Sequence, residues 1–143
     1  MSQVPVENRV GYLVKRIQQR FRQLSDEQLR PHGLSIAQYA VLRALADHPG
    51  ASSAEVARLC FVTRQSLQDV LGGLRKAELV VVSDEATVGR ARPVTLSPAG
   101  RRALRAADRV IMRIDERMLD GISAGDQETL ARLLGSCAAN LDG

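Results

Sequence analysis

The chain has 143 residues and carries 20 Lys and Arg against 16 Asp and Glu, which gives a net charge of +4. Hydrophobic residues make up 45% of it, but aromatic residues only 3%, with no Trp. This length fits one domain with helical extensions, and a core of Leu, Val, Ile and Ala favours helices over a β-sandwich. Because we find no apolar run of about 18 residues and no secretory signal, we expect a cytoplasmic protein without a membrane partner.

The positive charge is concentrated in the middle of the chain. Residues 51–105 contain nine Lys and Arg against five Asp and Glu, whereas residues 106–143 contain four against seven. A basic centre followed by an acidic tail predicts that the middle of the chain meets a polyanion. Charge alone fits a merely basic soluble protein equally well.

An amphipathic helix is predicted from residue 10 to residue 29, where a Pro-His-Gly turn follows. Its narrow stripe of apolar side chains is typical of a helix that packs against a partner helix. The stripe recurs at intervals of four and three residues: Val10, Val14, Ile17, Phe21 and Leu24.

Three short helices are predicted next, each opened by a capping residue. Ser35 with Gln38, and Ser52 with Glu55, have the spacing of capping boxes. Thr63 caps the third helix, which runs to about residue 76. The apolar stripe of this third helix consists of Leu67, Val70, Leu71 and Leu74.

The periodicity then changes from helical to extended. Residues 79–82 and 93–96 are short runs rich in β-branched residues, and the polar segment between them contains Gly89 and two arginines. Two such runs around a polar tip predict a β-hairpin.

Two more helices are predicted after the hairpin. Ser97 followed by Pro98 is typical of a helix start, and this helix is expected to reach about residue 119. Ser123 caps the last helix. The apolar positions of that last helix repeat by four, three and four residues: Leu130, Leu134, Cys137 and Leu141.

This order predicts a mainly α fold with a small β-hairpin wing, a winged helix-turn-helix with long terminal helices. We expect an N-terminal dimerisation helix over residues 1–34, a DNA-binding domain over residues 35–100 and C-terminal dimerisation helices over residues 101–143. A small monomer offers no evident partner for the terminal stripes, so we expect a homodimer. The residues expected at the dimer interface are Val10, Val14, Ile17, Phe21, Leu130, Leu134, Cys137 and Leu141.

The second helix of a helix-turn-helix lies in the major groove, where Arg, Gln, Ser and Thr can bond to bases or phosphates. In the wing, two arginines that flank Ala91 project to one side of an extended segment, and arginine can enter the minor groove. The same residues can also be read as a solvated helix face and a solvated loop. The predicted DNA-binding residues are Ser52, Ser53, Thr63, Arg64, Gln65, Ser66, Gln68, Arg75, Arg90 and Arg92.

Four segments resemble the MarR-type (multiple antibiotic resistance) regulators: residues 34–45, 53–59, 62–66 and 94–101. Their order covers nearly the whole chain. The resemblance implies a transcriptional regulator, a repressor, that binds double-stranded DNA at a pseudo-palindromic operator as a homodimer. It also implies that the start of the third short helix approaches the major groove, that Arg90 reaches the minor groove, and that a small effector, often aromatic, relieves binding.

Two positions depart from the pattern of this family. The family's wing usually has an acidic residue two positions before the arginine, where this chain has Val88. A glycine usually follows the recognition helix, where this chain has Glu78. The wing arginine is therefore expected to be less firmly oriented, and the end of the helix to differ.

Two other functions remain open at this point. One is a winged-helix dimer that binds proteins without binding DNA. The other is a redox-sensing regulator that uses Cys60, at the turn before the recognition helix, although a lone Cys among apolar neighbours is more often a buried hydrophobe. We find no phosphate-binding glycine loop, metal-ligand motif or nucleophile elbow, so we expect neither an enzyme nor a cofactor or metal.

Overall fold

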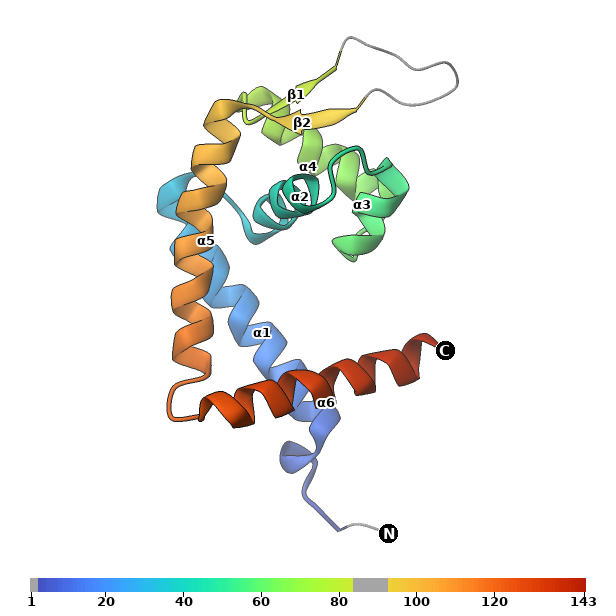
Figure 1. The fold of residues 1–143 in the computed structure, drawn as a ribbon, viewed down its shortest axis with the longest axis vertical. Helices are drawn as coiled ribbons and strands as arrows, with labels where there is room; N and C mark the ends of the chain where they lie inside the picture. The colour runs from blue at the N-terminus through green and yellow to red at the C-terminus, as the bar shows by residue number, and fades with distance from the viewer. Residues whose placement is uncertain (1–2, 84–92) are drawn as a thin grey trace. The chain divides into compact units, whose positions relative to one another are not determined.

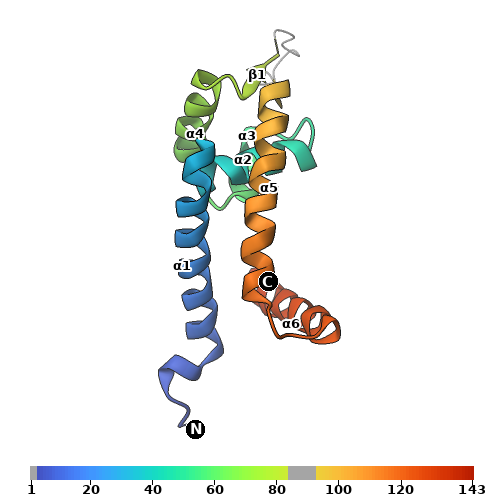
Figure 2. The same cartoon turned by 90° about the vertical axis from the view of Figure 1, so that its left-hand side faces the viewer.

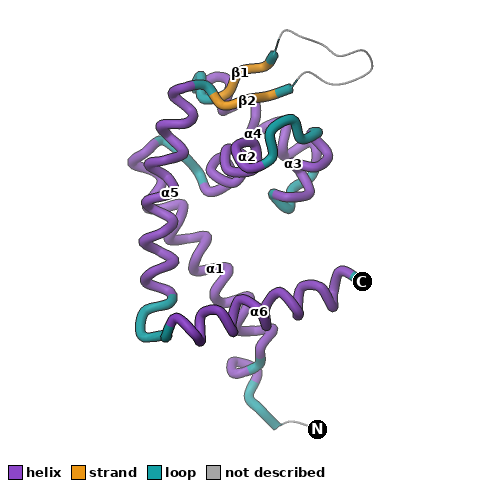
Figure 3. Tube along the Cα trace, in the orientation of Figure 1, coloured by secondary structure: helices purple, strands orange, loops and turns teal. Residues whose placement is uncertain are grey.

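The computed structural model describes residues 3–83 and 93–143. In these residues the helices and the hairpin follow one another in the predicted order (Figures 1 and 3), and the predicted fold class is confirmed. Two short 3-10 helices, Val6–Asn8 and Arg30–His32, flank the first helix. The main elements are α1 (Val10–Leu29), α2 (Ile36–Asp47), α3 (Ser53–Leu59), α4 (Arg64–Lys76), β1 (Val80–Val82), β2 (Val94–Leu96), α5 (Pro98–Met118) and α6 (Ala124–Asp142).

Side-chain caps begin the central helices where the sequence predicts them. Ser35 Oγ accepts from the Gln38 N–H at 3.1 Å, and Gln38 Oε1 accepts from the Ser35 N–H at 3.0 Å, which completes the predicted capping box. At α3, Ser52 Oγ accepts from the Glu55 N–H at 3.1 Å, while the Glu55 carboxylate accepts from the Ser52 hydroxyl at 3.4 Å. The second capping box is therefore half formed: the Ser52 side chain caps the helix, but the Glu55 carboxylate binds the Ser52 hydroxyl in place of the Ser52 backbone N–H.

Both α3 and α4 end on a residue other than glycine in the left-handed conformation. Phe61 has a φ of 56° and Glu78 a φ of 61°. In each case the next N–H reaches back five residues, from Val62 to the Ala57 carbonyl at 3.0 Å and from Leu79 to a carbonyl near the end of α4 at 2.9 Å. This is the Schellman ending that glycine usually provides. At Glu78 the chain follows the path that a glycine would take, contrary to the expected difference.

The hairpin is joined to both flanking helices through Ser97. β1 and β2 are antiparallel, with Val80 opposite Leu96. The Ser97 hydroxyl donates to the Glu78 carbonyl at 2.7 Å and accepts from the Gly100 N–H at 3.0 Å. One side chain thus joins the end of α4 to the first turn of α5.

Helix α2 occupies the centre of the winged helix-turn-helix. It packs against α4 and β2, and α3 packs against α4. Figure 2 shows α2 between α4 and the first half of α5. The side chains of Leu42, Leu67 and Leu74 are fully buried here, so the exposed face of α4 is held from behind by an apolar core.

The chain divides into two compact units, Met1–Ile111 and Met112–Gly143. The division falls inside the continuous helix α5. In the C-terminal unit, no residue of α6 is buried. Among the described residues, no helix combines the length and the apolar character needed to cross a membrane.

Candidate nucleic-acid interface

The first turn of α4 presents polar side chains to solvent. Thr63 caps the helix through its Oγ1, which accepts from the Ser66 N–H at 3.0 Å. Arg64, Gln65 and Gln68 are exposed, and no hydrogen bond or ion pair holds them within residues 3–83 and 93–143. Their donors and acceptors are therefore available to an external partner.

The predicted DNA contacts of α4 are of two kinds, which depend on the position of the residue along the helix. Arg75 is exposed on the last turn, eleven residues after Arg64, which corresponds to about 16 Å along the helix axis. The major groove is about 12 Å wide. If the first turn enters the groove, Arg75 stands at its rim, where phosphates are the nearest acceptors.

Three of the predicted residues also have a structural role. The hydroxyls of Ser52 and Thr63 cap their helices, and the Thr63 hydroxyl donates to Ser66 Oγ at 3.0 Å. Ser52 is exposed and Ser53 is half-buried. Caps at helix N-termini lie beside free backbone N–H groups, which favour phosphate. Capping and DNA contact are therefore compatible at these positions.

The wing arginines Arg90 and Arg92, together with Val88, lie outside the described residues. Their assignment to the minor groove stays a prediction. The strands on either side, β1 and β2, are described and paired, so the hairpin itself begins as predicted.

Cys60 is half-buried at the end of α3, and burial raises the pKa of its thiol. A raised pKa lowers the thiolate fraction on which cysteine oxidation depends. This environment fits the apolar reading of Cys60 better than the redox one. In the described part of the chain, no group of His, Cys, Asp or Glu side chains is arranged to hold a metal ion.

The residues predicted for the dimer interface are mostly exposed in the single chain. On α1, Val10 is 65% exposed, Val14 and Ile17 are also exposed, and Phe21 is half-buried. On α6 the whole predicted set is exposed: Leu130, Leu134, Cys137 and Leu141. Such apolar faces on two long helices need a cover.

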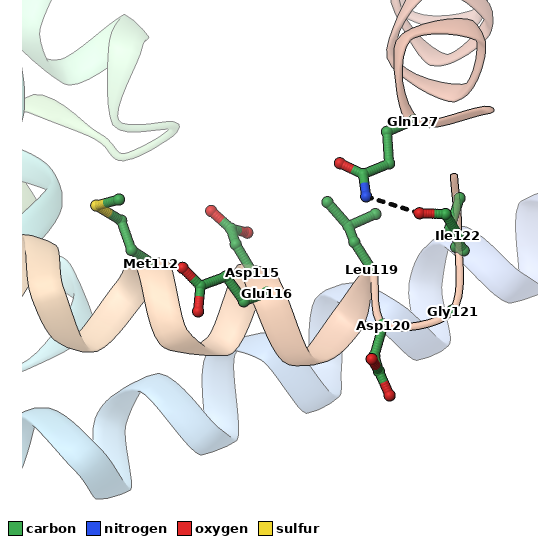
Figure 4. Close-up of a pocket in the computed structure, with 8 residues that line it drawn as sticks. All are labelled: Met112, Asp115, Glu116, Leu119, Asp120, Gly121, Ile122 and Gln127. Atoms are coloured by element: carbon green, nitrogen blue, oxygen red, sulfur yellow. Dashed lines mark hydrogen bonds between the residues drawn. The ribbon is translucent and has the colours of Figure 1, made fainter. Parts of the chain in front are cut away.

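A hollow of about 470 Å³ lies in the C-terminal unit, between the end of α5 and the start of α6 (Figure 4). The Gln127 side chain donates to the Ile122 carbonyl at 2.9 Å across the connecting turn. Three carboxylates and several apolar side chains line the hollow: Met112, Asp115, Glu116, Leu119, Asp120, Gly121, Ile122 and Gln127. Because the lining includes no Lys, Arg or His, an anionic ligand would be repelled.

A polar cluster between α2 and α5 was not predicted from the sequence. The Tyr39 hydroxyl donates to Asp108 Oδ1 at 2.8 Å, and Arg43 Nη1 donates to Asp108 Oδ2 at 2.7 Å. Arg43 also forms a two-point pair with Asp47 on its own helix. The hydrogen bond to Asp47 is the main cause that raises the pKa of Arg43, and the negative charge of Asp108 adds to it. Only the Arg43–Asp47 spacing of four residues is a signal that the sequence carries.

Comparison with known proteins decides the family. The sequence matches the model of the MarR family over residues 32–91. It is 35% identical to the HTH-type transcriptional repressor Rv2887 of Mycobacterium tuberculosis. The 125 aligned residues cover 87% of this chain and 90% of that relative. The chain belongs to the MarR family. It is therefore a transcriptional regulator and not an enzyme, as predicted.

Solved structures of this MarR relative match the fold along nearly its whole length. The Mycobacterium tuberculosis MarR family protein Rv2887 in complex with salicylic acid has a TM-score of 0.75 and 33% identity, covering 94% of this chain and 99% of that one. The complex of the same protein with DNA has a TM-score of 0.74 and 33% identity, covering 90% and 97%.

Proposed function

We propose that this MarR-family chain is a cytoplasmic repressor that binds a pseudo-palindromic operator as a homodimer. The main support comes from the first turn of α4, where Arg64, Gln65 and Gln68 are exposed and have no hydrogen-bond partner among the described residues. The opposite face of α4 packs on the buried core, which fixes the helix. Arg pairs with guanine and Gln with adenine through two bonds each. The DNA complex of the relative Rv2887 supports this assignment.

Dimerisation is supported by the terminal helices. A helix of 19 residues without one buried side chain, as α6 is here, has little to hold it in a monomer. The exposed apolar positions of α1 and α6 would be covered by a second copy. Two winged domains would then face two half-sites related by a twofold axis.

We propose a small aromatic acid as the effector that releases the DNA. The support comes from the relative Rv2887, whose structures contain salicylic acid and p-aminosalicylic acid. The hollow beside Asp115 and Asp120 does not suit such an anion, because its lining is acidic. Salicylate should weaken operator binding, whereas neutral salicylamide, of nearly the same shape, should do so much less.

Selection of bound fragments from random-sequence DNA tests the proposed function. The expected result is an enriched inverted repeat whose affinity falls steeply with salt, because phosphate contacts release counterions. Competition with unrelated duplex of the same length gives the specificity ratio. A chain that enriches no sequence and shows no salt-dependent binding to duplex DNA is instead a protein-interaction module.

A further inference from the structure

Two hydrogen bonds join α2 to α5 through one carboxylate, that of Asp108. Both oxygens of Asp108 are bound by α2, one by the Tyr39 hydroxyl at 2.8 Å and the other by the Arg43 guanidinium at 2.7 Å. The two α2 residues lie one helical turn apart, so they grip Asp108 at two points along the helix axis. The side chain of Asp108 is 28% exposed, which leaves the cluster partly shielded from water.

Arg43 is held in place from its other side. Its Nη2 lies 2.9 Å from Asp47 Oδ1, and its Nε lies 3.2 Å from Asp47 Oδ2. This two-point pair with a residue of the same helix fixes the plane of the guanidinium. The remaining Nη1 therefore points in a set direction, towards α5.

The other buried side chains of α5 near Asp108 are apolar. Leu104, Ala107 and Ile111 lie before and after it along the helix and are buried in the N-terminal unit. Apolar contacts are not directional, so they hold two helices together without strictly fixing their rotation or slide. Two short hydrogen bonds to one carboxylate do fix both.

The position of Asp108 gives this link a consequence for DNA binding. Asp108 lies three residues before the end of the N-terminal unit at Ile111, and α5 continues to Met118. Ser97 ties the winged helix-turn-helix to the first turn of α5, and the bonds to Asp108 add a second fixed point further along α5, which together define the rotation of the domain on that part of the helix.

We propose that Asp108 and Tyr39 are positioning residues that set the half-site spacing accepted by the dimer. This inference rests on the proposed function. Half-sites of a dimeric helix-turn-helix protein lie about 34–36 Å apart, and one added base pair moves a half-site by about 3.4 Å and turns it by about 35°. A dimer with both winged domains clamped to α5 accepts one spacing. A dimer with released clamps accepts several.

The test measures affinity against spacing. From the operator that the parent selects, a series is made in which the half-sites are moved together or apart by one or two base pairs. The parent should lose on the order of tenfold in affinity for a shift of one base pair. Asp108→Asn and Tyr39→Phe should flatten this profile while they bind a single half-site as the parent does.

Asp47→Asn is the matched control. It removes the charge of the pair that orients Arg43 but keeps an acceptor oxygen there and leaves both bonds from α2 to Asp108, so the spacing profile should stay clearly sharper than that of Asp108→Asn. The double variant Tyr39→Phe/Asp108→Ala should be no flatter than Asp108→Ala alone, because alanine leaves no acceptor for the Tyr39 hydroxyl and both changes release the same clamp. Tyr39→Phe removes only a hydroxyl, and it keeps the test valid if Asp108→Asn does not fold.

A sharp profile in both variants overturns the inference, even if their unfolding midpoints fall, since the cluster would then act on stability alone. The inference is also overturned if a variant loses as much affinity for a single half-site as it loses for the full operator, because the damage would then lie in the winged domain itself. If the parent binds no duplex DNA in a salt-dependent way, the proposed function fails instead.

Discussion

Phe61 and Glu78 hold a backbone conformation that glycine adopts without strain. A residue with a Cβ loses about 1–2 kcal/mol there, whereas glycine loses about 0.5–1 kcal/mol through its greater freedom in the unfolded chain. Phe61 is 96% exposed, so its ring contributes no packing that a substitution could remove. The conformation, not the side chain, dominates the balance at both positions.

Phe61→Gly and Glu78→Gly should therefore each raise the free energy of unfolding by about 0.5–1 kcal/mol. Urea denaturation followed by circular dichroism measures this change. Phe61→Ala is the control, because it removes the ring but keeps the Cβ, and it should give no gain. A gain of the same size in Phe61→Ala would show that the ring, not the backbone, carries the cost.

Gly100 is required for a different reason, which is close packing. A Cβ at this position would collide with the backbone carbonyl of Leu79, at the start of the hairpin. Backbone cannot yield as the end of a side chain can, so Gly100→Ala should lower the free energy of unfolding by roughly 1–3 kcal/mol.

Gly72→Ala is the comparison for Gly100→Ala. Apart from the neighbouring backbone of α4 itself, no atom of the described residues lies within 4 Å of a Cβ at position 72. In the interior of α4, alanine should raise the free energy of unfolding by about 1 kcal/mol. In thermal unfolding, the midpoint should fall for Gly100→Ala, because of packing, and rise for Gly72→Ala, because of helix propensity. A shift of the same sign in both variants would contradict these two causes.

At the scale of the helix, the two ends of α4 should differ in what they contact: the first turn should contact bases and the last turn phosphates. Gln65→Ala and Gln68→Ala should each cost about 1–3 kcal/mol of discrimination at one base pair, with little effect on unrelated DNA. Arg75→Ala, at the rim, should weaken binding to all sequences alike and reduce the salt slope by about one. Titrations of the three variants against the operator and its single-base variants measure both effects. If Arg75→Ala changes the preferred sequence, α4 lies differently in the groove.

The wing supplies a second prediction at this scale. With Arg90 at the predicted tip of the wing, Arg90→Ala should leave folding and dimerisation intact, because a loop residue of that kind usually contributes within about 0.5 kcal/mol to stability. Operator affinity should fall most for sites with A·T-rich flanks, where the minor groove is narrow. Arg92→Ala, nearer the strand, should do less. Parental affinity in Arg90→Ala on every flank would show that the wing is only a loop.

The starts of α2 to α6 could be predicted because each depends on a local capping contact. Ser123 Oγ accepts from the Asp126 N–H at 3.1 Å, three residues away, and a pattern of that length is visible in the sequence. The bond from Tyr39 to Asp108 joins residues 69 apart. It depends on how α2 and α5 pack, which no periodicity records. The left-handed Phe61 was missed for a related reason, because its residue type gives no sign of that conformation.

At the scale of the whole molecule, dimerisation should stabilise the terminal helices. Sedimentation at micromolar concentration should give twice the chain mass of 15.6 kDa. Ile17→Asp places a charge in the exposed apolar stripe of α1 and should shift the protein towards monomer and weaken operator binding. Gln18→Asp adds the same charge to the neighbouring polar position and should not. A monomeric parent that still binds the inverted repeat with full affinity would contradict the dimer.

Because α5 runs through the boundary between Ile111 and Met112, the two units share backbone hydrogen bonds. In a helix each N–H donates to the carbonyl four residues earlier, so the amides of residues 112–115 donate to carbonyls of the N-terminal unit. Loosening of the C-terminal unit must therefore fray α5 backwards, towards its buried first half. Amide hydrogen exchange along α5 should then become faster from Leu104 towards Met118. A second copy that covers the terminal helices would slow this exchange, so these few amides report assembly of the regulator before any DNA is added.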